Sequence, residues 1–215
     1  MENYSENFTC IVSNVTDIST VNLSEEKNSL LRTVNDQEAH RGEIILKWKE
    51  VFSRMGAKPK YCSSLESLKK AFDEAGRLYE INPIVDFYNA YSLCKGIPMA
   101  AYDQDKIVGR LTLRSARKDE DFVALGNPKQ IEKTKINEII YADDERVICR
   151  YWNLQDSHET RITEGTSKVL FVFDIMASKV FRVSVQFERI KSDFIRLFGD
   201  SISCGLTGPG VGTTA

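Results

Sequence analysis

The sequence predicts an α+β fold, in which helices pack on a central mixed β-sheet with a pocket at its edge. Amphipathic helical patterns gather in the first half of the chain, and patterns with the two-residue period of strands gather in the second half. The 215 residues fit one domain, or one domain with an extension, and are enough to bury a core without disulfide bonds.

Three early segments have the apolar spacing of helices. Residues 38–56 carry apolar side chains near helical spacing and end in a glycine. Residues 63–76 begin with Ser63 and place Glu66 three residues later, which is the pattern of a capping box. Pro83 fits the first turn of a third helix, because proline lacks the backbone N–H that a first turn leaves unpaired.

Strand patterns follow these helices. Residues 108–116 alternate between apolar and polar side chains, and residues 121–126 form a second short strand. Residues 138–153 predict a hairpin that turns at an Asp-Asp-Glu sequence, and the continuous apolar run 168–176 predicts a strand buried on both faces. Residues 178–199 fit helix and strand patterns alike, and their length favours a helix.

Composition divides the chain into three parts. Residues 1–38 predict N-terminal strands that pack on the body, residues 39–200 form the body, and residues 201–215 are rich in Gly and Thr and predict a flexible tail. The N-terminus lacks the basic start and apolar core of a signal peptide, and no apolar run approaches the roughly 20 residues of a membrane span. We therefore expect a cytoplasmic protein with no membrane partner.

The charge balance excludes a protein that is held on nucleic acid by its overall charge. The chain has 29 basic and 31 acidic residues, which gives a net charge of −2. Any RNA contact must therefore use a local basic cluster. Two clusters qualify. The first consists of Lys58, Lys60, Lys69, Lys70 and Arg77, and the second of Arg110, Arg114 and Arg117.

The sequence indicates neither a metal nor an organic cofactor. The five cysteines are scattered without the spacing of a metal site, which is typical of reduced thiols. The nucleophile elbow, the phosphate-binding loop, the zinc-protease motif and the dinucleotide-binding fingerprint are all missing. No catalytic residue can therefore be assigned from a motif.

The densest group of polar residues directly follows a strand pattern and spans residues 150–166. Binding groups concentrate in loops at strand ends. Arg150 could hold a carboxylate or phosphate through its planar fork, or form a salt bridge with an acid. Trp152 could form the wall of a pocket or belong to the core. The candidate substrate-binding residues of this segment are Arg150, Trp152, Asn153, Asp156 and Thr160.

The alternation of strand side chains gives Arg150 the same orientation as Ile148, because the two are separated by one residue. An arginine that points inward requires an anion, since a buried charge without a partner is very costly. We expect a carboxylate to hold the guanidinium while its free edge contacts a ligand. The candidate acids are Asp156, Asp103 and Asp86.

Two polar residues interrupt the apolar pattern of the third helix. Asp86 and Asn89 are three residues apart and share one helix face. Polar groups on a buried helix must be hydrogen-bonded. Either both residues tie the helix to neighbouring backbone, or Asn89 reaches into a pocket.

Several segments, in the same order, resemble the editing domain of the phenylalanyl-tRNA synthetase β chain. They are "IVDFYNAY", "GIPMAAYD", "LTLRSAR" and "ITEGTSKVLFVFDIM". The segments "KPKYCSSLE", "YADD" and "CRYWN" are similar to free-standing relatives of that domain. The resemblance covers about residues 56–176. It implies an α+β domain with a pocket at the edge of its sheet, which in the synthetase hydrolyses tyrosine wrongly attached to tRNA.

The resemblance also implies which residues build that pocket. The family's histidine falls on Ala100, its threonine on Tyr88, and the glutamate that reads the tyrosine hydroxyl on Val172. Without this glutamate we do not expect tyrosine-specific editing, because such discrimination depends on a hydrogen bond to the hydroxyl. One side of the pocket, in a helix and in the loop of Tyr102 and Asp103 that follows it, is assigned to Asp86, Asn89 and Asp103.

Three functions remain open at this point. The first is binding of tRNA or aminoacyl-tRNA, with deacylation of a mischarged amino acid in trans; such ester hydrolysis needs only a placed water and a stabilised oxyanion. The second is a non-catalytic pocket that binds a free amino acid or a similar small ligand. The third is a structural or partner-binding module. We do not expect a complete tRNA ligase, because 215 residues leave no room for its other parts, and no oligomeric state is indicated.

Overall fold

The computed structural model describes residues 10–15, 22–176, 182–199, 202, 205–207 and 213–214. The helices of these ranges are α1 (Leu23–Arg32), α2 (Glu38–Arg54), α3 (Ser64–Ala75), α4 (Pro83–Lys95) and α5 (Val183–Phe198), with the short 3-10 helices η2 (Val34–Gln37) and η3 (Gln104–Lys106). The strands are β1 (Cys10–Val15), β2 (Met99–Asp103), β3 (Arg110–Ser115), β4 (Asp121–Val123), β5 (Ile131–Lys133), β6 (Ile139–Ala142), β7 (Val147–Arg150), β8 (Gln155–Asp156), β9 (Val169–Phe173), β10 (Gly205–Thr207) and β11 (Thr213–Thr214).

The predicted helices are confirmed, and their caps explain where they begin. The side chain of Ser63 accepts a hydrogen bond from the backbone N–H of Glu66 at the start of α3, as the capping pattern predicts. Asn82 caps α4 by accepting from the N–H of Val85, and Pro83 occupies the first turn. The segment that fitted both patterns forms helix α5, as its length indicated.

The N-terminal part is only partly as expected. Strand β1 is present and pairs with β9. The prediction of strands up to residue 38 is wrong after residue 22, because helix α1 begins at Leu23. The apolar pattern of α1 is weak because Leu23 is its one buried residue, and the helix is instead marked by Asn22, which accepts a hydrogen bond from the N–H of Glu25. The division into three parts remains a prediction.

Two further segments differ from the expectation. Tyr102 and Asp103, expected in a loop, form the end of strand β2. This strand was missed because its small residues do not alternate between apolar and polar types. Most of the expected flexible tail, residues 201–215, lies outside the described residues, and the parts that are described pair with β1 and β3.

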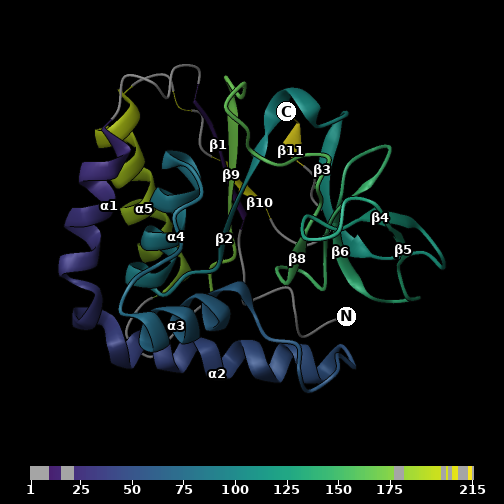
Figure 1. Ribbon diagram of the computed structural model, residues 1–215, viewed down its shortest axis with the longest axis horizontal. Helices are drawn as coiled ribbons and strands as arrows, with labels where there is room; N and C mark the ends of the chain where they lie inside the picture. The colour runs from purple at the N-terminus through teal and green to yellow at the C-terminus, as the bar shows by residue number, and fades with distance from the viewer. Residues whose placement is uncertain are drawn as a thin grey trace.

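The α+β class is confirmed, but the described strands form three antiparallel sheets, two larger ones and one of two strands, instead of one mixed sheet. The first has the order β10-β1-β9-β2 and the second the order β11-β3-β6-β7-β8, while β4 pairs with β5. Every pairing between these strands is antiparallel. Figure 1 shows α1, α4 and α5 on one side of the first sheet, the second sheet on the other side, and α2 below both.

Strands β2 and β9 separate two hydrophobic cores. Because strand side chains alternate, each strand contributes to both. The face toward α4 and α5 carries Met99, Ala101, Val169, Phe171 and Phe173. The opposite face, which meets α2 and the second sheet, carries Ala100, Tyr102, Leu170 and Val172. This second face is where buried polar side chains gather.

Candidate functional site

A buried carboxylate, Asp174, organises the polar side chains between the two sheets. It directly follows β9, and it accepts hydrogen bonds from the hydroxyl of Tyr141 (2.6 Å), from Nε1 of Trp152 (3.1 Å) and from Nδ2 of Asn153 (2.8 Å). Burial raises the pKa of Asp174 to about 6, although these three donors act in the opposite direction. Trp152 and Asn153, both predicted to bind substrate, are therefore anchored on this carboxylate.

The turn from β7 to β8 has an unusual backbone. Tyr151 and Trp152 have φ angles of 47° and 69°, in the left-handed region that bulky residues rarely adopt. Ring contacts hold both residues there: Trp152 meets Trp48 edge to face at 5.2 Å between centroids, and Tyr151 meets Tyr61 at 5.0 Å. Strained backbone persists only where its surroundings fix it, and it clusters at functional sites. This turn positions the start of β8.

Asp156 lies in β8 and faces the end of β2. The hydroxyl of Tyr102, a buried residue, donates a hydrogen bond of 2.9 Å to its carboxylate. Asp156 keeps part of its surface exposed, yet burial raises the pKa of its carboxyl, while hydrogen bonds from Cys149 and Tyr102 partly offset the rise. Among the described residues, no Lys or Arg forms a salt bridge with this carboxylate. Within the part of the chain that the structure describes, Asp156 is thus an acid without a neutralising cation.

Helix α4 adds Tyr88 beside this acid. Tyr88 is half-buried; burial, and then the negative charge of Asp156, raise the pKa of its hydroxyl, which therefore stays protonated. The neighbouring Asn89 is also half-buried. Its side chain makes no hydrogen bond to another described residue, and that Asn89 reaches into a pocket remains a prediction.

Two small apolar residues lie near this group on the paired strands. Ala100 of β2 stands directly opposite Val172 of β9. They share the strand face that carries Tyr102, and they are the positions to which the resemblance assigns a histidine and a glutamate. The pairing shows that these two positions are neighbours in space. That Tyr88, Ala100 and Val172 line a pocket remains a prediction from the resemblance; we refer to these three residues, with Tyr102 and Asp156, as the Asp156 recess.

Arg150 points inward, as strand alternation predicts, but its partners differ from those expected. Its Nε and one terminal nitrogen donate to both carboxylate oxygens of Glu138 at 2.7 and 2.8 Å, and the other terminal nitrogen donates to Glu132 at 2.9 Å. The expected partners Asp156, Asp103 and Asp86 were wrong, because the guanidinium lies toward the β4–β5 hairpin, over the ring of Phe122. All three nitrogens are thus engaged by protein carboxylates.

The other acids and the threonine named from the sequence tie elements together. The carboxylate of Asp103 accepts from the hydroxyl of Thr166 (2.9 Å), and its N–H donates to the carbonyl of Thr160 (2.9 Å), so that the end of β2 is fastened to the loop before β9. Asp86 accepts from the N–H of Ile81 at 2.8 Å. For Asp86, the interpretation as a tie between helix and backbone is confirmed.

Sequence reasoning missed three residues of these networks. Asp174 carried a signal, because it is an acid at the end of a fully apolar run, where a buried carboxylate needs several donors. Tyr102 was noted, but as part of a loop. Glu138 carried no distinctive signal, since acids before a strand are common on surfaces. No group of three His, Cys, Asp or Glu side chains placed to hold a metal ion occurs in the described part of the chain.

Comparison with known proteins gives these residues a context. The model of the B3/4 domain family matches residues 47–203, which is most of the chain. This chain belongs to the B3/4 domain family. The matched region runs from α2 beyond α5, so that the whole Asp156 recess lies inside the B3/4 domain.

Curated relatives carry one shared name, phenylalanine–tRNA ligase beta subunit. The protein of Corynebacterium jeikeium is 33% identical over 91 residues, which are 42% of this chain and 10% of that protein. That of Fusobacterium nucleatum is 38% identical over 72 residues, 34% of this chain and 9% of that protein. That of Mycoplasmoides gallisepticum is 29% identical over 123 residues, 57% of this chain and 15% of that protein. The chain thus spans less than a fifth of the length of these relatives.

Among the described helices, none is long and apolar enough to cross a bilayer.

Proposed function

We propose that this B3/4 domain binds aminoacyl-tRNA and hydrolyses the ester bond of a mischarged amino acid in trans. The observation that carries the proposal is Asp156, a half-buried acid with a raised pKa, two tyrosine hydroxyls nearby and no neutralising cation among the described residues. Perturbed acids of this kind are characteristic of functional sites. The link to tRNA comes from the relatives, whose name describes tRNA ligases.

The chemistry needs few groups. Asp156 accepts a proton from a water molecule, whose oxygen attacks the ester carbonyl and forms a tetrahedral intermediate. The hydroxyl of Tyr88, which stays protonated, and the amide of Asn89 donate hydrogen bonds to the oxyanion. When the intermediate collapses, the C–O bond to the ribose breaks, and the proton held by Asp156 passes to the ribose oxygen. The products are the free amino acid and uncharged tRNA.

The floor of the recess suggests the substrate class. Ala100 and Val172 lie opposite each other and offer no polar atom to an amino-acid side chain. A hydroxyl placed against them would lose its hydrogen bonds to water, which costs about 1–3 kcal/mol. The recess therefore favours an apolar aminoacyl group over a tyrosyl group.

Of the two basic clusters named from the sequence, the first offers the better path for RNA. Lys58 and Lys60 are exposed and line a hollow of about 450 Å³, whose other lysines, Lys49 and Lys70, form salt bridges with Glu66. In the second cluster, the guanidinium of Arg114 is held by the carboxylate of Glu120. Phosphates bound by lysines release counterions, so this contact weakens steeply with salt.

The catalytic proposal is tested by incubating the protein with a panel of aminoacylated tRNAs and following the loss of label. We expect hydrolysis of at least one tRNA charged with an apolar amino acid, slowed by about 10²-fold or more in Asp156→Asn. Asp144→Asn removes an exposed acid and is the matched control. Equal rates in Asp156→Asn and the parent would remove Asp156 from the mechanism.

The tRNA contact is tested separately from the chemistry. Binding of tRNA is measured by filter retention at several salt concentrations, for the parent and for Lys58→Gln with Lys60→Gln. Each lost phosphate contact reduces the slope of log affinity against log salt by about 0.7–0.9, so we expect a fall of roughly 1.5. The control changes Lys118 and Lys129, which flank β4, to Gln. An unchanged slope in the first variant would contradict the lysine path.

A non-catalytic pocket for a free amino acid is the second candidate. It is favoured by Ala100, because this position lacks the histidine that the resemblance assigns to it, and a general base is typically worth about 10² to 10⁴ in rate. Val172→Trp fills the floor of the recess and should abolish the binding of a free amino acid there. This second function holds if no aminoacyl-tRNA is hydrolysed, and if apolar amino acids bind the parent but not this variant.

A further inference from the structure

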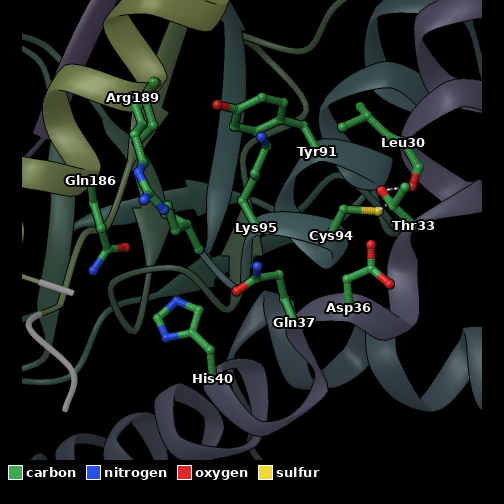
Figure 2. A pocket seen from close by; sticks show the side chains of 12 residues that line it. Leu30, Thr33, Asp36, Gln37, His40, Tyr91, Cys94, Lys95, Gln186 and Arg189 are labelled. Atoms are coloured by element: carbon green, nitrogen blue, oxygen red, sulfur yellow. Dashed lines mark hydrogen bonds between the residues drawn. The ribbon is translucent and has the colours of Figure 1, made fainter. Parts of the chain in front are cut away.

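The hollow lined by Lys58 and Lys60 is large enough for a small organic ligand. Its volume is about 450 Å³, within the range of about 300–1,000 Å³ that is common for ligand sites, and it lies between the end of α2 and the start of α3. Another hollow, among the helices, is lined by residues of α1, η2, α2, α4 and α5 (Figure 2). At about 230 Å³ it lies below that range. We call the larger one the lysine hollow.

Glu66 is the acid that lines the lysine hollow, and half of its carboxylate lacks a partner. The residue is 7% exposed. Its Oε1 lies 3.0 Å from Nζ of Lys70 and 3.4 Å from Nζ of Lys49. Its Oε2 is buried and has no hydrogen-bond partner within the part of the chain that the structure describes. A buried acceptor without a donor is costly, so a ligand that donates to both oxygens at once would be favoured.

The four lysines of the hollow differ in their partners. The side chains of Lys49 and Lys70 are 55% and 61% exposed, and salt bridges at such positions contribute little. A ligand can therefore take the place of Lys70 at Oε1 with little loss. Lys58 and Lys60 are exposed, and neither forms a salt bridge with a carboxylate of the described residues. The Nζ of Lys60 lies 5.8 Å from the ring centre of Tyr61. An anionic ligand group is expected at Lys58 and Lys60.

The donor pattern that this carboxylate requires is found on guanine. A carboxylate accepts two parallel N–H bonds when the donors lie side by side, as in its pairing with arginine. Guanine carries N1–H and N2–H side by side on its Watson–Crick edge. Adenine and cytosine have a ring-nitrogen acceptor beside their amino group, and uracil has a carbonyl on each side of its N–H. Each of these three bases would therefore turn a lone pair toward the carboxylate.

We propose that the lysine hollow binds a guanine nucleotide. N1–H and N2–H of the base donate to the two oxygens of Glu66, and the phosphate contacts Lys58 and Lys60. The ring of Tyr61, which also lines the hollow, offers a surface for the base. Such a nucleotide is either free or part of an RNA strand. The inference rests on the proposed function only in taking these two lysines as phosphate contacts, and it does not involve Asp156.

Isothermal titration of the full chain with the 5′-monophosphates of guanosine, adenosine, cytidine and uridine tests the choice of base. We expect guanosine monophosphate to bind about tenfold or more tightly than each of the others, because it alone donates twice to the carboxylate. Inosine monophosphate keeps N1–H and lacks the amino group, so it should also bind about tenfold or more weakly. Equal binding of all these nucleotides would show a phosphate site only, and either that result or no binding of guanosine monophosphate would overturn the proposal.

Variants test the residues. Glu66→Gln replaces one acceptor by a donor, so the preference for guanosine over adenosine monophosphate should fall about tenfold or more. The matched control is Glu50→Gln, which removes an exposed acid of α2 that does not line the hollow. Lys58→Gln with Lys60→Gln should weaken the binding of guanosine monophosphate but not that of guanosine, which has no phosphate. If Glu66→Gln keeps the full preference, Glu66 does not read the base and the proposal is wrong. If Glu66→Gln does not fold, the comparison with inosine monophosphate on the parent decides.

RNA oligonucleotides distinguish the two sources of the nucleotide. If the hollow binds RNA, a pentanucleotide with one guanine among uridines should bind more tightly than guanosine monophosphate and than a pentanucleotide of uridines alone. If it binds a free nucleotide, guanosine monophosphate should bind more tightly than either strand. A parent that hydrolyses aminoacyl-tRNA but shows no preference for guanine overturns the guanine site alone. A parent that prefers guanine but hydrolyses no aminoacyl-tRNA overturns the deacylation alone.

Discussion

Strand β7 and the turn after it separate two charged residues with opposite surroundings, the buried Arg150 and the half-buried Asp156. Arg150 has two glutamates on its three nitrogens and lies between the rings of Phe122 and Tyr151 at 5.7 and 5.3 Å. Among the described residues, Asp156 has a tyrosine hydroxyl and a thiol as partners, and its pKa is raised. Arg150 is neutralised by ion pairs and supports the fold. Asp156, which forms no ion pair with a described residue, remains available for chemistry.

Removing Arg150 should produce the largest loss of stability. Arg150→Ala leaves Glu138 unpaired, and the side chain of that glutamate is 1% exposed. Breaking a buried ion pair in this way costs about 3–5 kcal/mol. Arg150→Lys keeps the charge but loses the planar fork, so its loss should be smaller. Thermal and urea unfolding measure both effects.

The same variants distinguish a supporting role from a binding role. Deacylation and tRNA binding, measured under conditions where each variant is folded, should match the parent. If a folded Arg150→Lys protein binds tRNA more weakly with little loss of stability, Arg150 contacts the ligand. Arg150 and Asp156 would then not differ in role.

Asp174 should give the next largest effect, and a pH-dependent one. Its pKa rises from 3.8 to about 6 on folding. Between these values the folded state binds more protons than the unfolded state, so this group makes stability fall as pH rises from about 4 to 6. The full difference is on the order of 3 kcal/mol. Asp174→Asn cannot titrate, so the unfolding free energy of the variant should lack this decline.

Urea unfolding at pH 4.5 and pH 7.5 measures this contribution as a difference between parent and variant. The comparison cancels acids such as Glu120, whose pKa is lowered by Arg114 and which act with the opposite sign. Equal pH dependence in the two proteins would mean that Asp174 is ionised at the same pH in both states, and that its three donors outweigh its burial.

The sequence predicted the elements better than the contacts. Local signals marked the helices, since Ser63 and Pro83 act through the backbone within one turn. The strand alternation correctly turned Arg150 inward, but the choice among distant acids depends on how two sheets and a hairpin meet. Glu138 lies 12 residues away, and its hydrogen bonds to Arg150 arise from that arrangement alone.

The site was partly predictable for the same reason. The resemblance placed Ala100 and Val172 at related positions, and the register of β2 and β9 puts them side by side. Trp152 and Asn153 were chosen for their polarity after a strand, but their common partner Asp174 comes from another sheet. Residue type indicates what a side chain can bond, whereas the tertiary arrangement decides what it does bond.

Tyr102→Phe gives the smallest effect on stability and a sharp test of Asp156. The change removes one hydrogen bond, so we expect a loss of about 1 kcal/mol. That bond favours the charged carboxylate and lowers its pKa, so without it the pKa of Asp156 should rise further. If ionised Asp156 is the base, the acidic limb of the deacylation pH profile should move to higher pH.

Tyr88→Phe should instead slow the reaction by removing an oxyanion donor and leave that limb nearly in place. Tyr79→Phe, at a residue 76% exposed, is the control. If the acidic limb stays at the same pH in Tyr102→Phe, the titration belongs to another group. Asp156 would then not be the catalytic base, and its role would be structural, like that of Arg150.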